Sequence, residues 1–143
     1  MKRIMVLITL STMVTLCLIQ DSQAQRASSG NVREIIRQLE TDTDRFKPSL
    51  DSALDDSQLN GTKAEDEINE YVKRFEEATD RLRGRAEDRQ SAPGVAREVL
   101  TRARYINTFM RSHRLSAQAV ADWARVRNDL NRLAIAYNIR WRW

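Results

Sequence analysis

The sequence predicts an all-α protein, folded as an up-down-up-down antiparallel four-helix bundle. Glycine and proline are scarce, with 4 and 2 residues in a chain of 143, which leaves too few turn residues for a many-stranded β fold. Hydrophobic residues make up 41% of the chain and charged residues 31%, a balance that favours a folded domain over disorder. Apolar positions recur at alternating steps of four and three residues, the heptad-like spacing typical of helices that pack side by side.

The N-terminal segment has the pattern of a cleavable export signal. Lys2 and Arg3 precede an apolar stretch from residue 5 to residue 19, and Ser22-Gln23-Ala24 supplies small residues for cleavage after Ala24. The stretch is shorter than the roughly 20 apolar residues that span a membrane, which favours cleavage over an uncleaved anchor. We therefore expect an exported bacterial protein, periplasmic or secreted. The predicted parts are a signal peptide, a flexible leader and a four-helix domain, over residues 1–24, 25–31 and 32–143.

The first helix of this domain is predicted to begin after Asn31, because asparagine is a good N-cap residue. Pro48 lies inside the helix and is expected to kink or split it, since proline has no amide hydrogen and its ring clashes with the preceding turn. The positions expected to face inward are Val32, Ile36, Leu39, Thr43, Phe46, Leu50 and Ala53.

Asn60-Gly61 predicts the turn that leads to the second helix, and Thr62 with Glu65 forms the pattern of a capping box at its start. Asn60-Gly61-Thr62 also matches a glycosylation acceptor, but in a bacterial protein turn and cap chemistry is the preferred interpretation. The inward positions of this helix are Ile68, Val72, Phe75, Thr79, Leu82 and Ala86.

Ser91-Ala92-Pro93-Gly94 breaks the second helix, and the polar run from Arg111 to Arg114 ends the third. Ser116 is a candidate N-cap for the fourth. The inward positions of the third helix are Val95, Val99, Ala103, Ile106 and Met110. Those of the fourth are Ala119, Trp123, Val126, Leu130, Leu133 and Tyr137.

Short connections force neighbouring helices to be antiparallel. Facing residues in such a pair have position numbers with a constant sum, and the three predicted hairpins satisfy this rule with one set of layers. An aromatic layer is expected at Phe46, Phe75, Ile106 and Trp123, beside a small layer at Thr43, Thr79, Ala103 and Val126. The two threonines can mark a pocket, but packing is preferred because a helical threonine hydroxyl can bond its own backbone.

The composition argues against an enzyme. After cleavage at Ala24 no cysteine remains, which excludes a disulfide framework, a thiolate metal site and a cysteine nucleophile. His113 is the only histidine, and its place near the end of the third helix favours a capping or surface role. The Glu-x-x-His motifs of di-iron bundles and glycine-rich phosphate loops are also missing. We predict no catalytic residue, no metal and no cofactor.

Charge is divided unevenly along the chain. Residues 26–90 carry 12 basic and 16 acidic side chains, whereas residues 91–143 carry 10 basic and 3 acidic. An acidic hairpin is therefore expected to pack against a basic one. Two basic stripes with a spacing of seven residues are candidates for binding an anionic lipid or glycan, although a solvated surface is the preferred interpretation. They consist of Arg97, Arg104 and Arg111 on the third helix, and of Arg125 and Arg132 on the fourth.

The C-terminus combines aromatic and cationic side chains. Trp141 lies four residues beyond Tyr137 and is expected to continue the inward stripe and seal the bundle. Trp143 cannot share this direction. Because tryptophan and arginine together suit interfaces, both tryptophans are candidate interface residues.

These observations predict an exported, non-enzymatic helical-bundle protein of the cell envelope, acting as a protein-interaction or structural accessory for an unidentified envelope protein. The alternative is a chaperone-like or anionic-surface-binding protein. In size and charge the chain resembles small exported helical chaperones of bacterial envelopes, but residues 100–104 lack the glutamine of their Leu-Thr-x-x-Gln motif, and no family is assigned. Export disfavours nucleic acid as a partner. A monomer and a homodimer are both compatible with the heptads.

Overall fold

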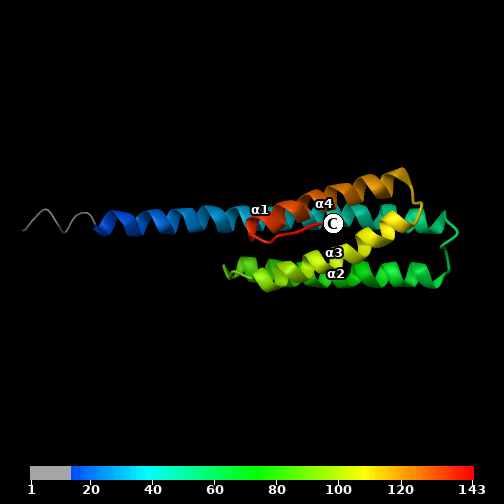
Figure 1. The fold of residues 1–143 in the computed structure, drawn as a ribbon, viewed down its shortest axis with the longest axis horizontal. Helices are drawn as coiled ribbons and strands as arrows, with labels where there is room; N and C mark the ends of the chain where they lie inside the picture. The colour runs from blue at the N-terminus through cyan, green and yellow to red at the C-terminus, as the bar shows by residue number, and fades with distance from the viewer. Residues whose placement is uncertain (1–13) are drawn as a thin grey trace, which may run out of the picture.

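A computed structural model describes the backbone of residues 14–143 and the side chains of residues 31–143. The chain forms an antiparallel four-helix bundle, which confirms the predicted fold class (Figure 1). The helices are α1 (Val14–Asp55), α2 (Lys63–Glu87), α3 (Pro93–Ser112) and α4 (Ala117–Ala136).

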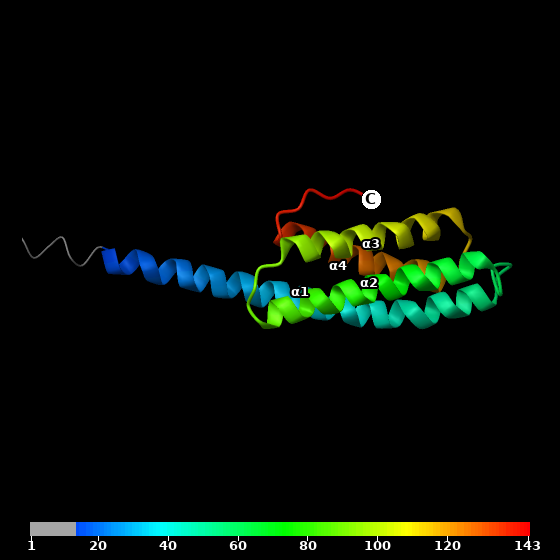
Figure 2. The same ribbon diagram turned by 90° about the horizontal axis from the view of Figure 1, so that it is seen from below.

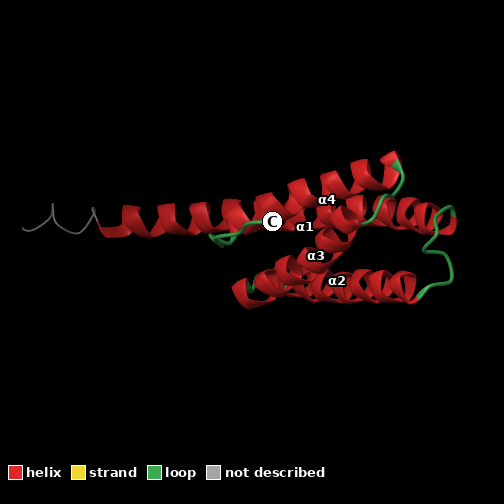
Figure 3. Cartoon of the chain, turned by 45° about the vertical axis from the view of Figure 1, so that its right-hand side comes forward, coloured by secondary structure: helices red, strands yellow, loops and turns green. Residues whose placement is uncertain are grey.

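The four helices are arranged as two layers. The first helix packs most closely on the last, α1 on α4, and α2 packs most closely on α3 (Figures 1 and 3). These two helix pairs therefore join the acidic hairpin, formed by α1 and α2, to the basic hairpin, formed by α3 and α4. Of the four helix pairs that touch, α3 and α4 contact one another least, although they are consecutive in the chain.

The helix α1 begins earlier than the sequence predicted. It runs from Val14 through residues 25–31, so the stretch expected to be a flexible leader is helical and Asn31 is not the first cap. With residues 14–24 in place, upstream carbonyls accept the amide hydrogens of residues 25–31, and no capping side chain is needed there. The first part of α1 projects beyond the other three helices (Figures 1 and 2).

The beginning of the predicted signal peptide, residues 1–13, lies outside the described residues. Within residues 14–143, none of the helices has both the length and the apolar character needed to cross a membrane.

The helix α1 also continues through Pro48 as one helix, so a split is excluded. Both Pro48 and Asp44, whose carbonyl loses its helical amide partner, are exposed. Water can therefore bind the free carbonyl group, which lowers the cost of proline at this position.

The core contains the residues that the heptad spacing predicted. Val32, Val95 and Tyr137 are partly buried and pack against it, and the other predicted inward positions are buried. The aromatic layer is centred on Trp123, whose ring centroid lies 5.1 Å from that of Phe46. The indole nitrogen of Trp123 donates a hydrogen bond to Asn107 Oδ1 at 3.1 Å, which satisfies two buried polar groups.

The helix starts follow the predicted capping in part. Ser116 Oγ accepts a hydrogen bond from the amide of Ala119, as expected for an N-cap. At the start of α2, the carboxylate of Glu65 accepts from the amide of Gly61 at 2.6 Å, whereas Thr62 makes no side-chain cap bond. Neither bond of the predicted capping box is present, because the Thr62 hydroxyl donates to the carbonyl of Leu59 and Glu65 bonds the amide of the residue before the N-cap.

Two helices end in Schellman motifs with a residue other than glycine in the left-handed conformation. After α2, Arg89 has φ 57° and the amide of Gln90 donates back to the carbonyl of Arg85. After α4, Asn138 has φ 52° and the amide of Ile139 donates to the carbonyl of Ala134. Glycine is the favoured residue at such positions, so Arg89 carries a backbone cost.

Replacing Arg89 by glycine is therefore expected to raise the free energy of unfolding by about 0.5–1 kcal/mol. Urea denaturation of the two chains measures the change. Lys73→Gly is the matched control, because Lys73 is exposed in the middle of α2, where glycine should cost about 1 kcal/mol. A loss of stability in both variants would contradict the assignment of strain to Arg89.

Candidate functional site

The three arginines predicted as a stripe on α3 have different environments. Arg97 and Arg111 are exposed. Arg104 instead holds the C-terminal tail, since its guanidinium donates to the carbonyl of Arg142 at 3.2 Å and lies 4.5 Å from the ring centroid of Trp141. The α3 stripe therefore offers two exposed cations and one that is engaged within the chain.

The two arginines predicted as a stripe on α4 lie above buried carboxylates. Arg125 pairs with Asp122 and Arg132 pairs with Asp129, each across one helical turn. The aspartate side chains are only 4% and 3% exposed, whereas those of Arg125 and Arg132 are 53% and 43% exposed. Each buried carboxylate therefore holds the guanidinium group of its arginine in place, while about half of the arginine side chain stays exposed at the surface.

The buried aspartates are Asp42, Asp122 and Asp129, and none of them was predicted to lie in the core. A repeated pattern in the sequence could have indicated two of them, because Gln38-x3-Asp42-x2-Arg45 on α1 recurs as Gln118-x3-Asp122-x2-Arg125 on α4. In both copies the glutamine amide donates to the aspartate and the arginine pairs with it. Each buried carboxylate is thus satisfied by its own helix.

The pKa values of Asp122 and Asp129 are shifted in opposite directions, although each residue pairs with an arginine. The hydrogen bond from Gln118, aided by Ser49 and Arg125, holds the pKa of Asp122 below its ordinary value. Burial, together with a hydrogen bond to the Asp42 carboxyl group on α1, raises the pKa of Asp129 to about 6. The Asp42 carboxyl group therefore disfavours the ionised form of Asp129 across the α1–α4 interface.

An open depression of about 440 Å³ lies over this carboxyl pair, between α1 and α4. The Asp129 Oδ2 atom is buried there without a hydrogen-bond donor among the described protein groups. An unpartnered carboxylate oxygen at this depth is costly when it is charged, which agrees with the raised pKa of Asp129. The depression is lined by Gln38, Asp42, Ala124, Arg125, Asn128, Asp129 and Arg132.

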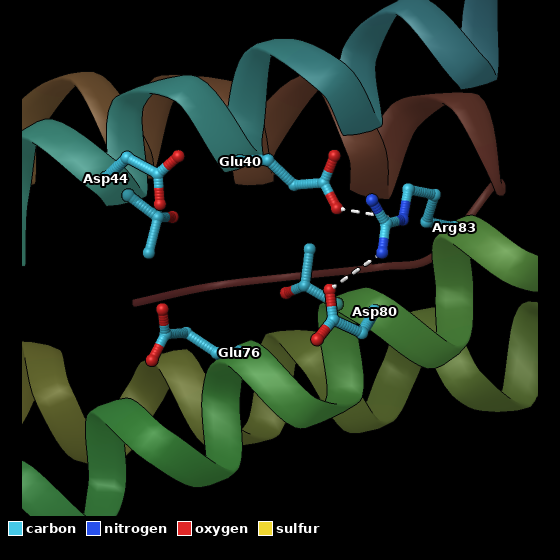
Figure 4. Close-up of a pocket in the computed structure, with 7 residues that line it drawn as sticks. Glu40, Asp44, Glu76, Asp80 and Arg83 are labelled. Carbon is cyan, nitrogen blue, oxygen red and sulfur yellow. Dashed lines mark hydrogen bonds and ion pairs between the residues drawn. The ribbon is translucent and has the colours of Figure 1, made fainter.

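A second, smaller groove of about 230 Å³ lies between α1 and α2 and is rich in carboxylates (Figure 4). Arg83 bridges its two walls, pairing with Glu40 on α1 and with Asp80 on its own helix, both at 3.3 Å. Burial raises the pKa of Glu40, and Arg83 opposes this rise. The groove is lined by Glu40, Thr43, Asp44, Glu76, Thr79, Asp80 and Arg83.

Thr43 and Thr79 form the buried part of this groove, and their hydroxyl groups donate to the carbonyls of Leu39 and Phe75 at 2.7 and 3.0 Å. Both alternatives from the sequence are therefore partly present, since the threonines line a groove and also bond their own helices. Among the described residues, no group of three or more histidine, cysteine or acidic side chains is placed to hold a metal ion.

The double variant Thr43→Val with Thr79→Val is expected to change the free energy of unfolding by less than about 1 kcal/mol. The helix carbonyls keep their backbone partners when the hydroxyls are removed. Thermal melts measure the effect, with Thr101→Val as control, since exposed Thr101 on α3 makes the same bond to its own helix. A clear loss of stability in the double variant alone would contradict simple packing.

The C-terminal tail folds back along the bundle instead of continuing α4 (Figure 2). The helix ends at Ala136, so Trp141 does not extend the helical stripe as predicted. Asn138 reverses the chain, and Trp141 instead reaches the core edge beneath Arg104. Both tryptophans of the tail are partly buried and pack against the core.

Trp143, whose position the sequence left open, joins this cluster from the tail. Its ring centroid lies 6.4 Å from that of Trp123 and 5.4 Å from that of Trp141. Its indole nitrogen donates to Asn131 Oδ1 at 2.9 Å, and the Arg127 guanidinium lies over its ring. The tail thus bonds to both α3 and α4, which contact each other least among the helix pairs that touch.

His113 ends α3, as the sequence suggested. It is the C-cap residue, and its Nδ1 atom lies 3.0 Å from the carbonyl of Phe109. The two rings also stack, with centroids 4.1 Å apart. These contacts give His113 a role in ending the helix.

The outward side of α4 is a surface that the sequence analysis missed. It carries no charged side chain along its centre, and its residues recur at steps of four and three like an interior seam. Ile135 is 79% exposed, and Val120 beside the stripe is 50% exposed. A second heptad pattern on the same helix was the available signal. We name this surface the α4 outer stripe, and it consists of Ala117, Ala121, Ala124, Asn128, Asn131 and Ile135.

The chain was compared with models of protein families, with curated proteins and with solved structures, and none of the three comparisons found a match.

Proposed function

We propose that this chain is an exported, non-enzymatic bundle of the bacterial envelope that acts by contact with another protein. The observation that carries this proposal is the α4 outer stripe. Four of its six residues are apolar and exposed, namely Ala117, Ala121, Ala124 and Ile135, and clustered apolar residues on a surface commonly mark contact sites. Exposed Ile135 and Val120 give this surface apolar anchors.

The proposed export rests on the N-terminal segment. Lys2, Arg3, the apolar stretch and Ser22-Gln23-Ala24 form the pattern of a cleaved signal. The first part of α1 projects away from the bundle (Figure 1). Cleavage after Ala24 would leave intact the α1 residues that pack with α4, which begin near Val32 in the core.

Photocrosslinking in exporting cells tests the proposed contact. A benzophenone amino acid at Ala124 is expected to give one discrete crosslinked species of higher mass. The same amino acid at Asn69, which is exposed on α2, is the control and should give none. The absence of any crosslink from position 124 would reject the proposed function.

Binding to an anionic surface is a second candidate, favoured by exposed Arg97 and Arg111 on α3. This function requires salt-sensitive retention of the chain on liposomes that contain anionic lipid. Replacing both arginines by glutamate should abolish the retention. Arg104 is left unchanged because it holds the tail. A parent chain that is not retained ends this candidate.

A further inference from the structure

We propose that the α4 outer stripe docks an acidic amphipathic helix of the partner protein. This inference rests on the proposed function and specifies the chemistry of its partner. The occupant is identified by two properties of the surface: its shape, which suits a helix, and the sign of the charge along its edges.

The shape of the stripe suits a second helix. Its residues follow one another at steps of 4, 3, 4, 3 and 4, which is the spacing of a seam between packed helices. Three of the six are alanines, whose small side chains allow the axis of a neighbouring helix to approach closely. Ile135 and Val120, near opposite ends of α4, can each insert between side chains of the partner.

The charge along the edges is positive. From residue 114 to the end of the chain, the acidic residues are Asp122 and Asp129, and both are buried. Arg125 and Arg132, seven residues apart on the α1 side of the stripe, keep about half of their side chains exposed. Glutamates seven residues apart on a partner helix match this spacing.

On the α1 side of the same edge, the Arg45 side chain is 60% exposed and pairs with buried Asp42. In the tail, Arg140 and Arg142 are exposed as well. An acidic helix therefore meets an excess of cations along α4 and the tail, opposed near Arg132 by exposed Glu34 of α1.

Other occupants fit less well. A second copy docked through the same α4 stripe would bring Arg125 and Arg132 close to arginines of its neighbour, and like charges along a helix pair destabilise it. A lipid surface favours large apolar side chains, whereas the centre of the stripe holds alanine and asparagine. These alternatives are outcomes of the test below.

Two synthetic probes test the charge of the partner. The first is a helical peptide of about three heptads with alanine and leucine on one face and glutamate on both edges. The second has lysine at every glutamate position. Fluorescence anisotropy with the full chain is expected to detect the glutamate peptide, with affinity that weakens as salt is added. The lysine peptide should not bind.

Variants of the chain locate the binding. Ala124→Glu is expected to weaken the glutamate peptide by about tenfold or more, because it places a larger, negative side chain in the middle of the stripe. Asn69→Glu on α2 is the matched control and should bind as the parent does. Arg125→Gln with Arg132→Gln should reduce the dependence on salt. Circular dichroism shows whether each variant folds.

Equal binding of the two peptides, or unchanged binding to Ala124→Glu, overturns the proposal. Self-association through the stripe, or displacement of the glutamate peptide by anionic vesicles, overturns it in favour of the other occupants. The crosslinking experiment at Ala124 distinguishes a failure of the acidic-helix proposal from a failure of the proposed function. A discrete crosslink without peptide binding rejects the acidic helix and leaves the protein contact standing, whereas no crosslink rejects the proposed function itself.

Discussion

Replacing Asp129 by asparagine is expected to raise the free energy of unfolding at pH 7 by about 1–3 kcal/mol. The pKa of Asp129 is raised from 3.8 to about 6 by burial and by the neighbouring Asp42 carboxyl group. Each unit of pKa corresponds to about 1.4 kcal/mol, so ionising Asp129 at neutral pH costs the native state up to about 3 kcal/mol. Asparagine removes one charge and keeps a similar shape.

The effect should depend on pH in a defined direction. The native chain holds the proton of Asp129 up to about pH 6, whereas the unfolded chain releases it near pH 3.8. Stability from this group is therefore fully present below pH 3.8 and is lost as the pH rises from about 4 to about 6. The difference between variant and parent should be smallest near pH 4 and largest at pH 7, as measured by urea denaturation across this range.

Asp122→Asn is the matched control, because Asp122 also lies on α4 under an arginine but has a lowered pKa. Its ionised form stabilises the native state, so this variant should be less stable than the parent at pH 7. A parallel loss in Asp129→Asn, or a stability difference that does not vary between pH 4 and pH 7, would contradict the raised pKa of Asp129.

Replacing Trp123 by alanine is expected to lower the free energy of unfolding by about 3–5 kcal/mol. The side chain is buried, contacts Phe46 on α1 and Trp143 in the tail, and hydrogen-bonds Asn107 on α3. Its removal leaves a cavity where three separate parts of the chain meet. It also leaves the Asn107 amide oxygen without its hydrogen-bond donor. Thermal and urea unfolding measure the loss.

Two further variants divide this effect. Trp123→Phe keeps an aromatic ring but loses the bond to Asn107, and should cost about 1–3 kcal/mol. Trp143→Ala removes only the ring packed from the tail, which is partly exposed, and should cost less than the loss of Trp123. A Trp123→Ala chain as stable as the parent would show that the aromatic cluster does not hold the bundle together.

Much of the fold was predictable because hydrophobic periodicity determines which face of a helix is buried. The inward positions from Ile36 to Leu133 were found at the predicted spacing, and the turn at Gly61 was found from local residue preferences. The rule fails for Asp42, Asp122 and Asp129. Burying a carboxylate is costly, so sequence rules place it outside unless its partners are known.

The candidate site was less predictable because pairing depends on contacts between distant segments. Spacing identified the arginine stripes, but it could not show that Arg104 holds the tail or that Arg125 lies above a buried carboxylate. The end of α4 was misplaced for a similar reason. Asn138 can adopt the left-handed conformation that ends a helix, yet the apolar spacing beyond it resembles a continuing stripe.

The close packing of α1 on α4 has a consequence for how the chain folds. The helix α1 is the first in the sequence and α4 is the last, so their contacts join residues far apart in sequence and raise the contact order. Half of the core cannot form until the last helix is available, after synthesis and any passage across a membrane are nearly complete. Refolding should therefore be slower than in a bundle held together by sequential hairpins.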